Sequence, residues 1–240
     1  MAQTEESLIN SIVIPGDVVL DIKTDVKRKI IVGPGLRVSS DKVIVTKCGI
    51  LHKKAPNTYW VDSHQKRYVP ARGETVVGIV TNKVGDVFKV DIGSSEQAQL
   101  PYVAFEGATK KNRPNLNVGD VVCAKLLVAN RDMEPELVCV DSHGKKGKLG
   151  ILSSDGFLFN CSLNLVRKIL HPKCPLLDTF QRSLQMPFEI AAGMNGFIWI
   201  KAKTVDETIA VANAILAAEF KSDSEIKDLC DNIGNILAGF

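Results

Sequence analysis

Residues 87–93 read Val-Phe-Lys-Val-Asp-Ile-Gly, and this stretch decides the fold of the middle of the chain. Its apolar and polar side chains alternate, with Phe88, Val90 and Ile92 on one face and the residues between them on the other. Alternation with a period of two marks a strand with one buried face. Glycine-containing turns bound this strand on both sides, so we expect it to be short.

Four further strands are predicted around this one, and turn-forming residues separate them all. The five strands are expected at residues 75–82, 86–92, 97–102, 120–130 and 136–141. A small closed barrel is the economical way to join such a set without leaving sheet edges exposed. The long connection over residues 104–117 carries Lys110, Lys111 and Arg113. A basic loop beside a barrel face is the arrangement that oligonucleotide-binding barrels use.

Composition sets limits on what the chain can be. Its 240 residues leave room for more than one domain, because a typical domain has roughly 100–150 residues. A net charge of +3 does not by itself indicate nucleic acid, so that argument depends on where the charges cluster. Glu5 and Glu6 stand in an N-terminus without an apolar core, so no secretory signal is expected. No apolar run approaches the ~20 residues of a membrane span.

The six cysteines are scattered without the paired spacing of a zinc knuckle. In a chain without a secretory signal they are best interpreted as free thiols, mostly small core residues. No metal and no cofactor is therefore predicted.

A small β module is expected over residues 12–62, after a stretch at residues 1–11 that is expected to be disordered. The module is too small to hold a large core, so it is expected to pack against the barrel or a partner. Tyr59 and Trp60 are neighbours in a strand and point to opposite faces, so at most one needs to be core. The other is a candidate anchor for a partner.

From residue 150 the pattern becomes that of an α+β domain with helices on one face of a sheet. A hairpin with an Asp-Gly turn is predicted from strands at residues 151–152 and 157–159. Two more strands, at residues 188–192 and 197–201, flank a short glycine turn. Helices are expected over residues 162–171, 176–184, 204–220 and 223–237, with N-terminal caps at Ser162, Thr204 and Ser222. The domain boundaries that follow are 1–65, 66–148 and 149–240.

Three kinds of chemistry are weighed against this organisation. Asp132, Glu134 and Glu136 could hold magnesium for phosphodiester hydrolysis, although no second acidic cluster or histidine completes such a site. No Ser or Cys stands in a nucleophile elbow, so nucleophilic catalysis is not indicated.

Nucleic-acid binding is the third kind, because single-strand readers combine a basic groove with aromatic platforms. Phe88 shares its face with apolar residues and is expected in the core. A merely solvated basic loop is the alternative interpretation. The basic segments at residues 66–67 and 145–148 have two interpretations, a solvated linker and a contact with the phosphate backbone. The RNA-binding candidates are Lys83, Lys89, Tyr102, Phe105, Lys110, Lys111 and Arg113.

Several motifs together carry a resemblance to a known family over nearly the whole chain. Residues 87–93 and 118–122 resemble an S1 RNA-binding domain, and the C-terminal order of elements resembles a KH domain. The combination is similar to the S1/KH cap subunits of the eukaryotic RNA exosome. The remaining motifs are Pro15-Gly16-Asp17, Gly33-Pro34-Gly35, Tyr59-Trp60-Val61-Asp62, Lys66-Arg67-Tyr68-Val69-Pro70, residues 105–114 and Gly193-Met194-Asn195-Gly196.

The resemblance implies a non-catalytic subunit that acts in ribosomal-RNA processing and RNA decay in the nucleus, the nucleolus and the cytoplasm. Its implied partners are the RNase PH-like ring subunits, the other cap subunits and single-stranded RNA, without a membrane. Such caps hold the ring together and guide RNA into its channel. A free-standing single-stranded RNA-binding regulator is the alternative. The residues implied in docking are Pro15, Gly16, Asp17, Tyr59 and Trp60.

One departure from the usual KH pattern stands out. A KH domain grips RNA with a Gly-x-x-Gly loop, usually between two helices. Here the segment between the first two predicted helices, residues 171–175, has no glycine. The Gly-x-x-Gly sequence at residues 193–196 lies between two strands and contains no basic residue. We therefore expect Gly193, Met194, Asn195 and Gly196 to form a structural motif that packs between domains, and we expect this KH domain not to bind RNA in the usual way.

Overall fold

The chain folds as two compact units, Met1–Gln65 and Lys66–Phe240. The computed structural model describes residues 8–22, 30–109, 111–130, 132–171, 174, 176–177, 179 and 187–238.

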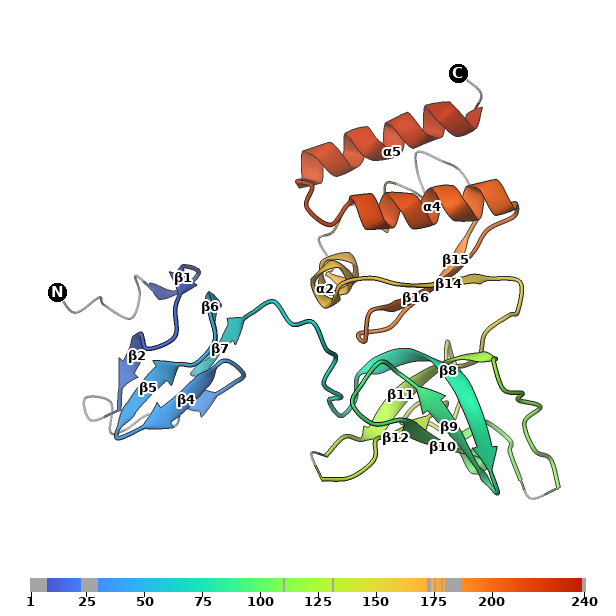
Figure 1. Cartoon of the computed structure of the whole chain (residues 1–240), viewed down its shortest axis with the longest axis horizontal. Coiled ribbons are helices and arrows are strands. Elements are labelled where there is room, and N and C mark those ends of the chain that lie inside the picture. Colours follow the sequence, from blue (N-terminus) through green and yellow to red (C-terminus); the bar gives the residue numbers. More distant parts are fainter. Residues whose placement is uncertain are drawn as a thin grey trace. The chain divides into compact units, whose positions relative to one another are not determined.

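The first unit consists of two small sheets around one core (Figure 1, blue). Leu8 is only 6% exposed and packs into this core, so the expectation that residues 1–11 are disordered is wrong for this residue. Residues 1–7 lie outside the described residues. One sheet has the order β1 (Ile12–Val13), β6 (Gly49–Lys54), β7 (Thr58–Asp62), β3 (Ile31–Val32), and the other β2 (Val18–Asp21), β5 (Lys42–Val45), β4 (Leu36–Ser39).

The second unit begins with the predicted barrel. Its strands neighbour one another in the order β12-β10-β9-β8-β11, and pairing of β11 with β12 closes the circle. Each strand overlaps the range predicted for it, so the five-stranded barrel is confirmed. A short strand, β13 (Gly150–Ile151), also pairs with β11. The barrel strands are β8 (Thr75–Val84), β9 (Val87–Asp91), β10 (Ala98–Pro101), β11 (Val121–Val128) and β12 (Glu136–Val138), with a 3-10 turn η1 (Tyr102–Ala104) after β10.

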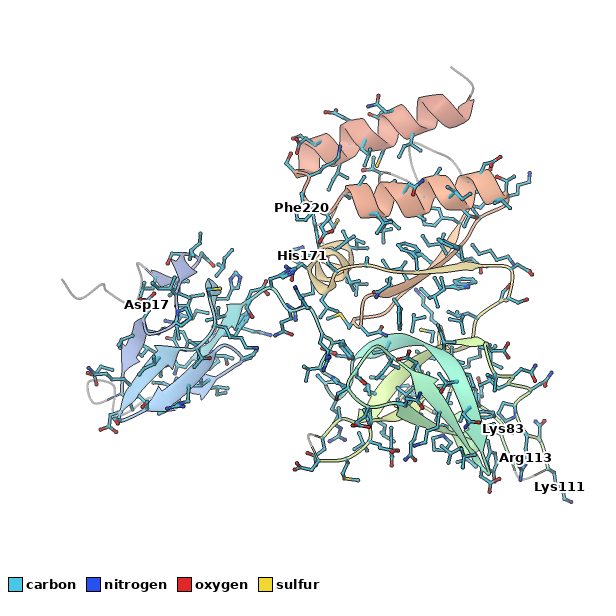
Figure 2. All side chains as sticks on the ribbon, in the orientation of Figure 1. Asp17, Lys83, Lys111, Arg113, His171 and Phe220 are labelled. Carbon is cyan, nitrogen blue, oxygen red and sulfur yellow. The ribbon has the colours of Figure 1, made fainter. Side chains whose placement is uncertain are left out.

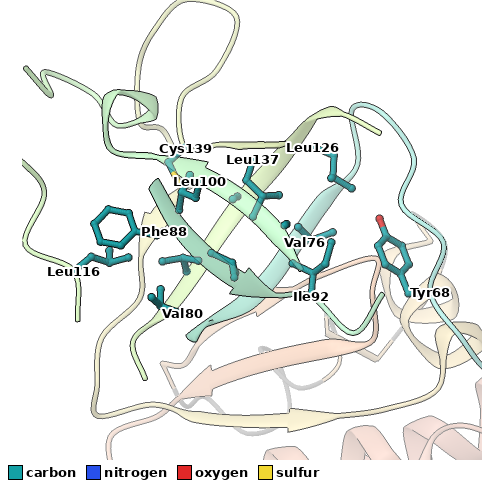
Figure 3. Packing of buried hydrophobic residues seen from close by; sticks show 14 of the residues in the cluster. Tyr68, Val76, Val80, Phe88, Ile92, Leu100, Leu116, Leu126, Leu137 and Cys139 are labelled. Atoms are coloured by element: carbon teal, nitrogen blue, oxygen red, sulfur yellow. The ribbon is translucent and has the colours of Figure 1, made fainter. Parts of the chain in front are cut away.

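Alternating side chains of these strands fill the barrel interior (Figure 3). Phe88 is 2% exposed and Val90 and Ile92 are fully buried, as the alternation predicted. Burying one such side chain stabilises the fold by roughly 1.5–3 kcal/mol. Burial also raises the pKa of Cys123 to about 11 and that of Cys139 to about 12, so both are protonated thiols at neutral pH.

A three-stranded antiparallel sheet with helices on one face completes the second unit (Figure 1, yellow to red). The hairpin predicted around the Asp-Gly turn is wrong, because β13 pairs with the barrel and β14 pairs with β16. The helix predicted over residues 176–184 falls largely outside the described residues. The elements are β14 (Phe157–Asn160), α2 (Leu163–Leu170), β15 (Glu189–Ala192), β16 (Phe197–Lys201), α4 (Val205–Ala217) and α5 (Asp223–Ala238).

Side-chain caps fix where these helices begin and end. Ser162 accepts from the Leu165 amide at 3.1 Å, and Thr204 and Glu207 form the predicted capping box. Lys168 donates to the carbonyl oxygens of Ala218 at 2.8 Å and of Lys221 at 2.6 Å. It thereby bonds to carbonyl oxygens of the segment that follows α4, and it ties α2 to this segment. Within the described residues, no helix is long and apolar enough to cross a membrane.

Candidate nucleic-acid interface

The glycine turn between β15 and β16 lies against the barrel. Asn195 is 5% exposed, and its Nδ2 donates to the carbonyl oxygens of Val77 at 2.7 Å and Ile92 at 2.9 Å. Its Oδ1 accepts from the Val77 amide at 3.2 Å, and the Met194 amide donates to the Thr75 carbonyl at 2.9 Å. The turn is therefore bonded to the backbone of β8 and to the end of β9, and the Asn195 side chain faces the barrel rather than solvent.

Both glycines of this turn are required by close approaches. A Cβ atom on Gly193 would lie 2.2 Å from Asn195 Oδ1 and 2.5 Å from the Val77 amide nitrogen. Gly196 has a φ of +91°, in the region that favours glycine, and a Cβ atom there would lie 2.6 Å from the Cys161 carbonyl oxygen. Neither glycine position therefore has room for a side chain.

The apolar contact between the barrel and the α+β sheet centres on Trp199. This side chain is 3% exposed and packs with Val77 and Cys123 of the barrel. Trp199 is thus both buried and part of the interdomain contact. Because the sheet packs on β8 and β11 here, this part of the barrel exterior is not open to a nucleic acid.

Basic side chains lie at the opposite end of the β8–β9 hairpin, around its turn. Figure 2 shows the labelled Lys83, Arg113 and Lys111 toward the same end of the barrel. Arg113 Nη2 lies 3.1 Å from Asp86 Oδ1, and Arg113 Cζ lies 4.9 Å from the centroid of the Tyr102 ring. Lys83 Nζ lies 5.3 Å from the centroid of the Phe88 ring, while Lys83 itself is exposed. This end of the barrel combines exposed positive charge with aromatic support.

A polar triad occupies the outer surface of β9 and β10. Lys89 Nζ lies 2.5 Å from Glu134 Oε2, and the Gln99 amide also donates to that carboxylate. These hydrogen bonds hold the pKa of Glu134 below its ordinary value. Glu134 is therefore the partner of a lysine, which does not fit the magnesium site considered for the acidic residues nearby. Among the described residues, no cluster of His, Cys, Asp and Glu could hold a metal ion.

The remaining RNA-binding candidates differ in how accessible they are. Tyr102 is 7% exposed and belongs to the barrel core, so Arg113 rather than open solvent lies over its ring. Phe105 is half-buried against the same core, and Lys111 is exposed. Lys110 lies outside the described residues. Asp86 was not among the predicted site residues, because an aspartate after a turn glycine has no feature that distinguishes it in the sequence.

The basic segments beside the barrel are also placed by the structure. Tyr68 is buried in the barrel core and donates to Glu74 Oε2 at 2.5 Å, so burial raises its pKa. Lys66 and Arg67 next to it are exposed. The Lys146 amide donates to Glu106 Oε2 at 2.7 Å, which holds the second basic segment against the loop after η1.

The predicted docking residues lie on two parts of the first unit. Pro15 and Gly16 form an exposed turn that is closed by hydrogen bonds of Asp17, whose Oδ2 accepts from the Ile14 amide at 2.9 Å. Tyr59 is 3% exposed and is core, while Trp60 is half-buried with its ring 5.6 Å from that of His52.

An exposed aliphatic cluster near the docking residues was not predicted from the sequence. Ile12 is 78% exposed and pairs across the strands with Ile50, which is 43% exposed. Ile14, at 59%, follows in the chain. We define Ile12, Ile14 and Ile50 as the aliphatic cluster of the first unit.

Gly196→Val is expected to destabilise the second unit by about 2 kcal/mol, because a β-branched residue would be held in the left-handed region beside the Cys161 carbonyl. Urea unfolding measures the loss. Affinity for single-stranded RNA, measured where the variant is still folded, should equal that of the wild type. A variant with wild-type stability and defective RNA binding would contradict the structural role of the motif.

A closed barrel with a basic end, joined by hydrogen bonds and an apolar contact to an α+β domain, defines the class of S1/KH RNA-binding proteins. The description "Exosome complex component RRP40, S1 domain" matches residues 68–150, and "KH domain" matches residues 156–206. "Mammalian exosome complex component RRP40, N-terminal" matches residues 11–64. The chain belongs to the exosome complex component RRP40 family.

Individual relatives support this assignment. The Exosome complex component RRP40 of Drosophila melanogaster is 50% identical over 232 residues, covering 96% of this chain and 99% of the relative. The Homo sapiens protein of that name is 49% identical over 207 residues, covering 84% of this chain and 74% of the relative. The predicted family and fold class are confirmed. Family membership assigns the chain a non-catalytic role in an exosome complex, as expected.

A solved structure shows the same fold at low identity. The crystal structure of a proposed exosome complex RNA-binding protein superposes with a TM-score of 0.59 at 21% identity. The match covers 72% of this chain and 99% of that protein.

Proposed function

We propose that this chain is a cap subunit of an exosome, which stabilises a ring of RNase PH-like subunits and guides single-stranded RNA into the ring's channel for 3'-5' processing and decay. The observation that carries the proposal is the basic end of the barrel in a chain of the RRP40 family. The other cap subunits would be its neighbours on the ring. Work in the nucleus, the nucleolus and the cytoplasm belongs to the same proposal.

The first unit, residues 1–65, is proposed as the ring-docking module. Its aliphatic cluster supports this role, because Ile12 and Ile50 are exposed and paired across neighbouring strands, and exposed apolar patches are typical of interaction sites. The turn at residues 15–17 and the half-buried Trp60 are the further contact candidates. Tyr59, being core, would support Trp60 from within rather than contact a partner.

The barrel, residues 66–148, is proposed to meet the RNA, and residues 149–240 to support it. The charges at the basic end are few, and two of the predicted cations already have acidic partners in Asp86 and Glu134. Each phosphate contact adds roughly 0.7 to the salt slope of single-strand binding, so a few cations give only weak affinity. A subunit of a larger complex can tolerate this because neighbours contribute to the RNA path.

The native size of the protein in lysate, with mass spectrometry of the co-eluting proteins, tests the proposal. A particle of several hundred kilodaltons that contains RNase PH-like proteins is expected. A monomeric peak near the chain mass of 26.1 kDa, persisting at low salt, would contradict it and would favour a free-standing RNA-binding regulator. Substituting Ile12 and Ile50 by serine should shift the protein toward the monomeric peak if the aliphatic cluster docks on the ring.

Glu134→Gln is expected to tighten single-stranded RNA binding, because it frees Lys89 for a phosphate. One added phosphate contact should steepen the dependence of log affinity on log salt by about 0.7. Fluorescence anisotropy of a labelled oligouridine at several salt concentrations measures this slope.

Glu96→Gln is the matched control for this substitution. It removes the same charge from the exposed turn after β9, away from the Lys89 pair, and it should leave the slope unchanged. Equal slopes for both variants would show that Lys89 does not reach the RNA.

A further inference from the structure

Arg113 is held at the basic end of the barrel by two partners from different parts of the fold. Its Nη2 lies 3.1 Å from Asp86 Oδ1, in the β8–β9 turn, and its Cζ lies 4.9 Å from the ring centroid of Tyr102, at the start of η1. The Tyr102 amide donates to the Asp86 carbonyl at 3.1 Å, so the two partners are also fixed to each other. A flexible arginine is thereby given a defined position.

Arg113 is partly covered by the barrel and partly exposed. On one side is the Tyr102 ring, which is 7% exposed and packed in the barrel core. Half of the Arg113 side-chain surface is nevertheless exposed, at 50%. Arg113 is therefore a half-exposed cation that lies against a buried ring. In single-stranded RNA recognition, unstacked bases stack on aromatic rings or on arginine guanidinium planes.

The aromatic side chains near Arg113 are less accessible for stacking with a base than Arg113 itself. Tyr102 is buried under Arg113, and Phe105 is half-buried against the core. The Asp86 carboxylate occupies one edge of the guanidinium and offsets part of its charge. This pairing weakens a phosphate contact, while half of the Arg113 side chain stays exposed. The arrangement therefore suits stacking better than charge attraction.

We propose that Arg113 is the base-stacking platform of the barrel, and that Asp86 and Tyr102 are positioning residues that act through it. The ligand is single-stranded RNA with at least one unstacked base, and Lys83 and Lys111 would contact the phosphates on either side. Since every base has a flat face, the platform has little base preference. This inference rests on the proposed function, in which this end of the barrel meets RNA.

Two oligonucleotides separate stacking from charge. One is an oligouridine, and the other has the same length and charge with abasic sugars at its central positions. Arg113→Lys keeps the charge and removes the plane, so it should weaken oligouridine binding about tenfold, within the range of one stacked base. Binding of the abasic oligonucleotide should not change. Thermal unfolding of the variant shows whether the fold is intact.

For Asp86→Asn, a positioning role and a pure charge effect predict opposite changes in RNA affinity. If Asp86 positions the platform, the variant binds oligouridine more weakly although it carries one negative charge fewer. If charge alone matters, the variant binds both oligonucleotides more tightly. Tighter binding of both would overturn the inference, and so would a wild-type chain that does not distinguish the two oligonucleotides.

Lys111→Ala separates a failure of the stacking proposal from a failure of the proposed RNA path. It should weaken both oligonucleotides equally and lower the salt slope by about 0.7, because it removes a phosphate contact. If Lys111→Ala has this effect while Arg113→Lys binds as the wild type does, stacking is wrong and the RNA path stands. If neither variant changes binding, this end of the barrel does not meet RNA and both proposals fail.

Discussion

Asn195→Asp is expected to destabilise the second unit by about 3–5 kcal/mol, although the two side chains have nearly the same shape. The amide nitrogen of Asn195 donates to the carbonyl oxygens of Val77 and Ile92, and the side chain is 5% exposed. A carboxylate can still accept from the Val77 amide, but it would face both carbonyl oxygens at a buried position. Urea unfolding followed by tryptophan fluorescence measures the loss, because Trp199 lies in the same interdomain contact.

The loss should depend on pH with a definite sign. Burial beside two carbonyl oxygens raises the pKa of the new carboxyl above the ordinary aspartate value of about 3.9. A group whose pKa is higher in the folded state contributes stability that is present at low pH and is lost as the pH rises through the folded pKa. The variant should therefore be closest to wild type in acid and weakest at neutral pH and above.

Asn213→Asp is the matched control for this substitution. Asn213 is exposed on α4, so the same change should alter the unfolding free energy by no more than about 0.5 kcal/mol. Equal stability of the two variants at neutral pH would contradict the role of Asn195 as the bond between the domains.

Local patterns in the sequence were sufficient for the elements. The alternation at residues 87–93 predicted a strand whose inward residues are now seen buried, since a period of two fixes which side chains share a face. Capping side chains located the starts of α2 and α4 within a residue, because Ser162 and Thr204 bond to amides three residues away. The basic loop with Lys111 and Arg113 was also predicted, because charged residues can be located in a sequence without knowing their contacts.

Those local patterns did not predict pairing between residues that are far apart in the sequence. The Asp-Gly turn predicted a local hairpin. In the structure, β13 pairs with β11 and β14 pairs with β16, in different sheets. Val77 stands 118 positions from the Asn195 that binds it, and no periodicity links the two. The same holds for Asp86 and Tyr102, whose relation to Arg113 exists only once the barrel has closed. The sequence therefore located the basic end, while the fold was needed to show which groups position it.

Gly156→Ala is expected to destabilise the second unit by about 3 kcal/mol, the cost of overfilling a packed core. A Cβ atom there would lie 2.2 Å from Trp199 Cε2 and from Trp199 Nε1. The indole cannot easily move aside, because it is buried against Val77 and Cys123 of the barrel. The change should therefore loosen the interdomain contact while the first unit, measured by hydrogen exchange, keeps its protection.

Trp199→Phe provides the decisive comparison for that substitution, because phenylalanine lacks Nε1 and the outer ring whose atoms the new methyl would meet. Among the described residues, Trp199 Nε1 is buried without a hydrogen-bond partner, so this replacement loses packing but no hydrogen bond. The double variant should be more stable than the sum of the single changes predicts, by about 1–2 kcal/mol. Strict additivity of the two losses would mean that Gly156 is needed for its backbone alone, and that the indole does not determine how closely this turn approaches the interdomain contact.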